Sequence, residues 1–138
     1  MGCEEMAKVN DIIFCLNSVN LQGQGVSANA ILSAITPEYI PGLFTFSVIV
    51  TILDIDLEKE PILKIVFGKD EDTLGVIEGP LPNIEDTSNL PKEYRGINLS
   101  IDMNNTNFKS DGLYKLSVFL NEELLKEKEI YVKGKNQE

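Results

Sequence analysis

Histidine is absent from the 138 residues of this chain. Its absence excludes Ser-His-Asp and Cys-His nucleophilic systems, the commonest general base and the zinc sites that use histidine. A carboxylate pair could still catalyse glycoside hydrolysis, and Asp54 with Asp56 is the most obvious such pair. Because two acids in a charged loop are usually just solvated, we expect no enzyme activity and no cofactor.

Basic residues are also scarce. The chain has 12 Lys and Arg against 22 Asp and Glu, for a formal net charge of −10. Nucleic-acid binding rests on neutralising phosphates with basic side chains, so a nucleic-acid partner is not expected. The same argument disfavours an anionic membrane surface, and the charge is best interpreted as a contribution to solubility.

Cysteines and long apolar runs are few. Cys3 and Cys15 cannot form a framework of several disulfides, and Cys15 in "DIIFCLN" has the setting of a small buried apolar residue. The longest apolar-rich run, 43–53, is too short to span a membrane. The first residues show no basic region followed by an apolar stretch, so the expected location is cytoplasmic.

The apolar residues that are present recur with a period of two. "LFTFSVIVTIL" alternates in this way over 43–53, and so do "INLSIDM" and "YKLSVFL". No segment shows a convincing helical period. Expected strands therefore cover 11–17, 30–35, 43–53, 62–68, 97–103, 114–120 and the end of 121–134.

Turn-forming residues separate these strands. Glycines and prolines in "QGQG" (22–25) and "TPEYIPG" (36–42) interrupt the pattern. We interpret 54–61 as a charged hairpin loop, 121–123 as a tight hairpin turn, and 78–94 as a surface loop that crosses between sheets.

Seven or eight short strands without crossover helices predict an all-β fold, an antiparallel β-sandwich. The expected domain covers 10–134, with a flexible extension at 1–9 and a tail at 135–138. "MAKVN", beginning at Met6, has the form of an alternative start.

Metal and phosphate sites have little support. Asp54 with Asp56, and Asp70 with Asp72, have the Asp-x-Asp form of calcium loops. A strand of eight residues would hold the two pairs about 26 Å apart, and either pair alone is a poor site, so no metal is expected. "LQGQGVSANAIL" lacks the third glycine and the lysine of phosphate loops, and is interpreted as a plain loop between strands.

The C-terminal stretch "SDGLYKLSVFLNEELLKEKEIYV" resembles the last two strands of an immunoglobulin-like sandwich. Gly112 and Tyr114 match the spacing of the tyrosine corner, which implies that the Tyr114 hydroxyl bonds to nearby backbone. Leu116 stands where that family has its second cysteine, so the inter-sheet disulfide is absent. Gly112 and Tyr114 are thus expected to be structural residues.

A broader resemblance, from Asn10 to Lys133, is to a family of small bacterial and phage proteins, a domain-of-unknown-function group. It rests on "DIIFCLNSVN", "PGLFTFSVIV", "LPKEYRGINLSIDMNNTNF" and "DGLYKLSVFLNEELLKEKEIYVKG". The resemblance implies a standalone immunoglobulin-like β-sandwich and offers no catalytic residues.

These observations favour a non-catalytic binding or protein-interaction module. A protein partner, or a second copy of the chain, would meet it at a sheet edge or at the loops 36–42 and 78–95. Tyr39, Tyr94 and Arg95 are the candidate contact residues, because they are amphipathic side chains beside proline-rich loops. The alternatives are a nucleotide- or sugar-binding sandwich used in phage–host conflict and, third, the carboxylate hydrolase.

Overall fold

A computed structural model describes residues 7–21, 25–54, 61–70, 72–80 and 96–135, and within these it contains nine β-strands and no helix. The strands are β1 (Lys8–Leu21), β2 (Gly25–Ile31), β3 (Ala34–Ile35), β4 (Gly42–Leu53), β5 (Ile62–Lys69), β6 (Asp72–Pro80), β7 (Gly96–Phe108), β8 (Gly112–Leu120) and β9 (Glu123–Val132).

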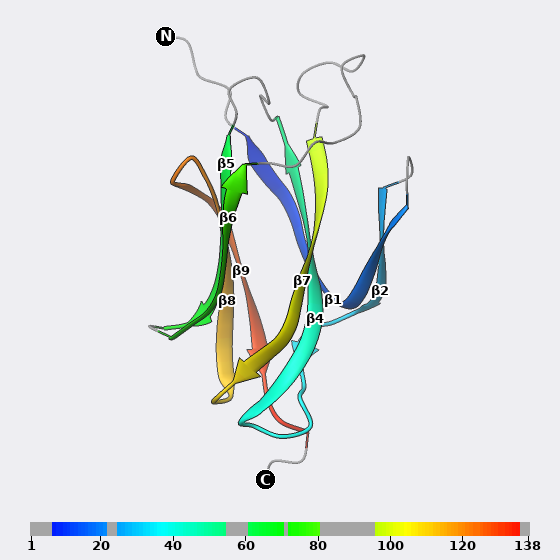
Figure 1. Cartoon of the computed structure of the whole chain (residues 1–138), viewed down its shortest axis with the longest axis vertical. Coiled ribbons are helices and arrows are strands. Elements are labelled where there is room, and N and C mark those ends of the chain that lie inside the picture. Colours follow the sequence, from blue (N-terminus) through cyan, green and yellow to red (C-terminus); the bar gives the residue numbers. More distant parts are fainter. Residues whose placement is uncertain (1–6, 22–24, 55–60, 71, 81–95, 136–138) are drawn as a thin grey trace.

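The strands form two sheets that face each other (Figure 1). One has four strands in the order β2-β1-β4-β7, and the other has five in the order β3-β9-β8-β5-β6. All neighbours are antiparallel except the short β3, which runs parallel to β9. The structure thus confirms the all-β sandwich. Its strand order is immunoglobulin-like, since β1-β4-β7 and β9-β8-β5-β6 correspond to the A-B-E and G-F-C-C′ sheets of that fold.

The core lies between the sheets and follows from the period of two. Alternate residues of β4 are fully buried, and they meet the equally buried inward residues of β5 and β8. Aromatic rings gather at one place in this core, with centroids 5.3–6.3 Å apart. The cluster consists of Phe14, Phe46, Phe67, Phe108 and Tyr114. Aliphatic residues and Met103 fill the rest of the core.

The start of β8 forms a corner around Tyr114. Its ring is completely buried, and its hydroxyl donates a 2.6 Å hydrogen bond to the Ser110 carbonyl, the bond that defines a tyrosine corner. Gly112 has φ +133°, which an L side chain rarely adopts. Lys69 of β5 lies over the Tyr114 ring, 5.9 Å from its centroid, and donates to the Asp111 carbonyl at 2.6 Å.

The second half of β1, beyond Cys15, and β2 form an arm outside the sandwich. Beyond Cys15 the hairpin leaves the sheet and approaches β7, where the Ser18 and Ser100 hydroxyls are hydrogen-bonded. Figure 1 shows this arm on the side of β4 and β7 that faces away from the five-stranded sheet. The expectation of a plain loop followed by a strand at 30–35 was therefore wrong. Residues 25–31 pair with β1, and β3 begins only at Ala34.

Three further predictions need correction or adjustment. The connection 54–61 is not a hairpin, because β4 and β5 belong to different sheets. Strand β6 was not predicted, since Gly75, Gly79 and Pro80 weaken its pattern. The first strand begins at Lys8, three residues before the expected strand 11–17, and residues 1–6 of the expected extension lie outside the described residues.

Candidate functional site

Of the three candidate contact residues, the structure describes only Tyr39, while Tyr94 and Arg95 lie outside the described residues. The Tyr39 side chain is 64% exposed. It lines a depression of about 330 Å³ between the β3–β4 connection and the segment that follows β9, together with Thr36, Glu38, Pro41, Gly42, Leu43, Phe44 and Lys135. A 3.9 Å ion pair between Lys135 and Glu38 lies at this depression.

The described residues give little support to the aspartate pairs as catalytic or calcium-binding sites. Asp54 follows β4 with φ +61°, and its buried Oδ1 has no hydrogen-bond partner among the described residues. Asp56 lies outside those residues. No group of three or more metal-ligating side chains occurs in the described part of the chain. Asp70 and Asp72 flank the β5–β6 turn, at the other end of β5 from Asp54. The calcium and hydrolase alternatives therefore remain predictions.

The outer faces of the two sheets differ. On the four-stranded sheet Ile49 and Ser47 point away from the core cluster, yet they are only 4% and 3% exposed. They lie on the side of β4 where the arm approaches β7. The Ser47 hydroxyl donates a 2.7 Å hydrogen bond to Asp102, so this buried polar group is satisfied. This side of β4 is thus buried at Ile49 and Ser47, whereas the outward residues Asn98 and Ser100 of β7 are exposed.

The other outer face is open to solvent. We call it the open face and define it as the outward side chains of β5, β6, β8 and β9. Its members are Ile62, Lys64, Val66, Val76, Glu78, Leu113, Lys115, Ser117, Phe119, Leu124, Glu127, Glu129 and Tyr131.

Apolar side chains of the open face stand in cross-strand pairs. Leu113 pairs with Tyr131, Val66 with Val76, and Phe119 with Leu124. Tyr131 is the most exposed of these, at 66%. Solvent-facing sides of antiparallel strands are usually polar, so paired apolar residues here are a departure from the normal alternation.

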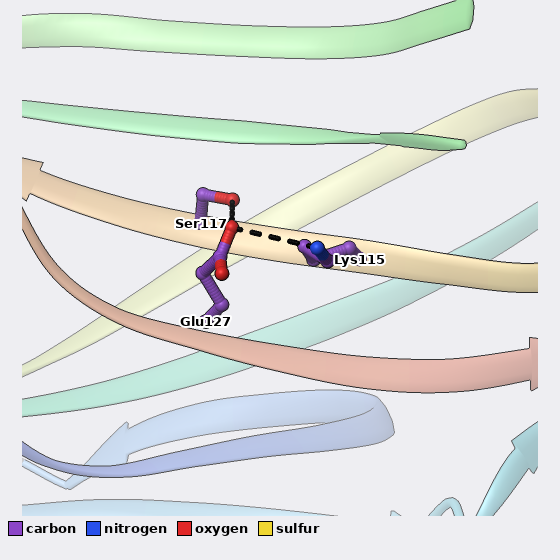
Figure 2. Close-up of polar contacts among 3 residues, drawn as sticks. All are labelled: Lys115, Ser117 and Glu127. Atoms are coloured by element: carbon purple, nitrogen blue, oxygen red, sulfur yellow. Dashed lines mark hydrogen bonds and ion pairs between the residues drawn. The ribbon is translucent and has the colours of Figure 1, made fainter. Parts of the chain in front are cut away.

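A polar group separates two of these pairs. Glu127 of β9 accepts a 3.1 Å hydrogen bond from the Ser117 hydroxyl and lies 3.7 Å from the Lys115 ammonium, as Figure 2 shows. Serine and lysine together are the residue types of some nucleophilic systems. Here, however, the Ser117 hydroxyl donates to the carboxylate. None of the three residues lines the depression beside Tyr39 or a second, larger depression at one end of the open face. We interpret them as the polar centre of a surface.

The larger depression, of about 480 Å³, lies at one end of the open face. Ile62, Lys64, Glu78, Phe119, Asn121 and Glu122 line it. Asn121 and Glu122 form the two-residue β8–β9 turn, where both have positive φ, as this tight hairpin connection requires. The Asn121 side chain accepts a 3.0 Å hydrogen bond from the Ile62 amide, which fixes the turn against β5.

The one thiol in the described residues is not a reactive site. Cys15 is completely buried at the base of the arm. Burial raises the pKa of the Cys15 thiol above its usual value, and the nearby Asp102 carboxylate raises it further. A buried thiol with a raised pKa is a poor nucleophile.

Comparisons with known proteins leave the family open. No family model matches the chain, and no curated protein matches it. Among solved structures it is similar to a crystal structure of an immunoglobulin-like protein from Pseudomonas aeruginosa, with a TM-score of 0.48 and 15% sequence identity over 95% of this chain and 99% of that chain. The resemblance to the bacterial and phage family therefore stays a prediction.

The open face was missed by sequence reasoning, although the sequence carries a signal for it. In β8, Leu113 and Phe119 are apolar on the face opposite to Tyr114 and Leu116, and Val66 has the same relation to the core residues of β5. An apolar residue on the second face of a strand indicates a second contact, but only the pairing of strands shows that such residues are neighbours.

Within the described residues, no helix is long and apolar enough to cross a membrane.

Proposed function

We propose that this chain is a non-catalytic module that binds a protein partner on its open face. The observation that carries the proposal is the presence of three outward cross-strand apolar pairs around a polar centre, each with at least one exposed member. Protein interfaces combine aromatic and aliphatic anchors with polar groups in this way, and a few anchors usually supply most of the affinity.

The contrast with the other sheet supports this assignment. The outward apolar residue Ile49 of the four-stranded sheet is buried, on the side of β4 where the arm approaches β7. On the open face the comparable residues Leu113, Leu124 and Tyr131 remain exposed. Removing them from water on contact with a partner would contribute roughly 25 cal/mol per Å² of apolar surface.

Affinity capture tests the proposal when matched surface variants are compared. The immobilised protein is exposed to a lysate of cells that carry its gene, and captured proteins are quantified. We expect a partner that binds the wild type and is lost from the double variant Leu113→Ser, Tyr131→Ser. Tyr39→Ser serves as the control, because Tyr39 is as exposed as Tyr131 but lies on the β3–β4 connection and is not part of the open face.

Titration of the purified partner then gives the decisive numbers. We expect the open-face double variant to weaken binding at least about tenfold, the scale of a single good anchor, and the control to bind as the wild type does. Equal affinities for all three proteins would show that the partner docks elsewhere.

A second candidate function, binding of a nucleotide or sugar, is favoured by the depression beside Tyr39. Its volume of about 330 Å³ and its aromatic and apolar lining suit a small ligand. A thermal-shift screen should then find a ligand that raises the Tm of the wild type and not that of Tyr39→Ala. No stabilisation by any nucleotide or sugar would remove this candidate, and with it a role for such a ligand in phage–host conflict.

A further inference from the structure

The two carboxylates of the 480 Å³ depression have no cationic partner among the described residues. Glu78 stands opposite Lys64 in the β5–β6 ladder, where an ion pair between them would be normal. The Lys64 ammonium instead lies over the Phe119 ring, 5.9 Å from its centroid. Neither Glu78 nor Glu122 forms an ion pair within the described part of the chain.

The same depression is lined by apolar and acidic side chains together. Phe119 and Ile62 are the apolar residues of its lining, and Glu78 and Glu122 are the carboxylates. An arginine or lysine side chain matches this combination, since its aliphatic stem packs on apolar surface while its charged end reaches polar groups. An anionic group does not, because the two carboxylates repel it.

The charge of the whole molecule acts in the same direction. With a net charge of −10, the chain attracts cationic partners from a distance and repels anionic ones. Among the described residues that line the depression, Lys64 is the one cation, and its ammonium lies over the Phe119 ring, so an incoming cation is directed to the carboxylates. Phe119 also belongs to the open face, which makes the depression continuous with the proposed docking surface.

We propose that this depression receives an arginine or lysine side chain of the protein partner. The inference rests on the proposed function. It names one type of side chain that the open face would select in its partner. The partner is thus expected to present a basic side chain next to an apolar patch, as charge complementarity requires.

A titration without the partner tests the inference separately. The probes are N-acetyl-arginine methylamide and N-acetyl-lysine methylamide, added to the ¹⁵N-labelled full chain and followed by amide chemical shifts. We expect saturable shifts at Lys64, Phe119, Asn121 and Glu122. The uncharged norleucine analogue should produce no such shifts, because it lacks the charged end.

Variants make the outcome decisive. Glu78→Gln combined with Glu122→Gln should weaken probe binding about threefold to tenfold, whereas Glu129→Gln, a carboxylate of the open face outside the depression, should leave it unchanged. Shifts spread over all acidic residues, or unaltered by the double variant, would overturn the inference. The open-face proposal would survive that result, because it is tested by Leu113 and Tyr131.

Discussion

At the scale of the residue, the corner before β8 shows what spacing predicts and what it cannot. The positions of Gly112 and Tyr114 in the sequence indicate the corner, and the hydroxyl of Tyr114 reaches the Ser110 carbonyl as that motif implies. Lys69 could not be predicted, because it comes from another strand and meets the corner only after β5 and β8 pair.

Replacing Tyr114 by Phe removes only the hydroxyl of this corner. We expect the free energy of unfolding to fall by about 1 kcal/mol, because one buried hydrogen bond is lost and the Ser110 carbonyl loses its partner. Urea denaturation measures the change. Tyr131→Phe is the control, since the exposed Tyr131 has no such bond, and equal losses in the two variants would contradict the structural role.

Replacing Gly112 by Ala tests the backbone of the corner. The φ of +133° strains any L side chain, and the added Cβ would lie 2.8 Å from the Lys69 Nζ. We expect a loss of roughly 1 to 3 kcal/mol, the usual cost of such strain. Gly79→Ala, which meets nothing within 4 Å, should change stability little. A Gly112→Ala variant as stable as Gly79→Ala would show that the corner is not strained.

Cys15 gives a pH-dependent prediction. Because burial raises the folded-state pKa of this thiol above the ordinary value of 9.0, the folded state holds the thiol proton more tightly than the unfolded state. Its contribution to stability is complete below pH 9 and falls as the pH rises further. Comparing the wild type with Cys15→Ala between pH 8 and 10 measures it, and parallel stability curves would refute the burial argument.

At the scale of the element, strands with a strong alternation of apolar and polar residues could be predicted from the sequence. The edge strand β2 could not. β4, β7 and β8 have alternate residues in a large core, so their patterns predict them. β2 contains small and polar residues and pairs only with β1, and its strand state is decided by that partner and not by its own propensity. The arm, and the burial of Ile49 on the outer side of β4, follow from this pairing.

The arm predicts an asymmetry between two outward-facing isoleucines. Ile49→Ala should cost roughly 2 to 4 kcal/mol, because Ile49 is only 4% exposed and its truncation leaves a cavity. Ile62→Ala, at 41% exposure on the open face, should cost under about 1 kcal/mol. Thermal or urea unfolding of both variants checks the difference. Similar losses would show that nothing covers the outer side of β4.

At the scale of the whole molecule, the sandwich could be predicted and the candidate site could not. A period of two, repeated between turns, admits few architectures, and the described structure has the expected one. The open face depends on which strands are neighbours, since Leu113 and Tyr131 become a pair only through the β8–β9 register. The predicted contact residue Tyr39 lies at a different place, in its own depression.

The central claim, that a partner docks on the open face, can be measured on the unaltered protein. Tyr131 and Tyr39 are nearly equally exposed, at 66% and 64%, so hydroxyl-radical footprinting should oxidise both at similar rates in the free chain. With the captured partner bound, the account predicts strong protection of Tyr131 and unchanged oxidation of Tyr39. Protection of Tyr39 with Tyr131 still fully reactive would contradict the account.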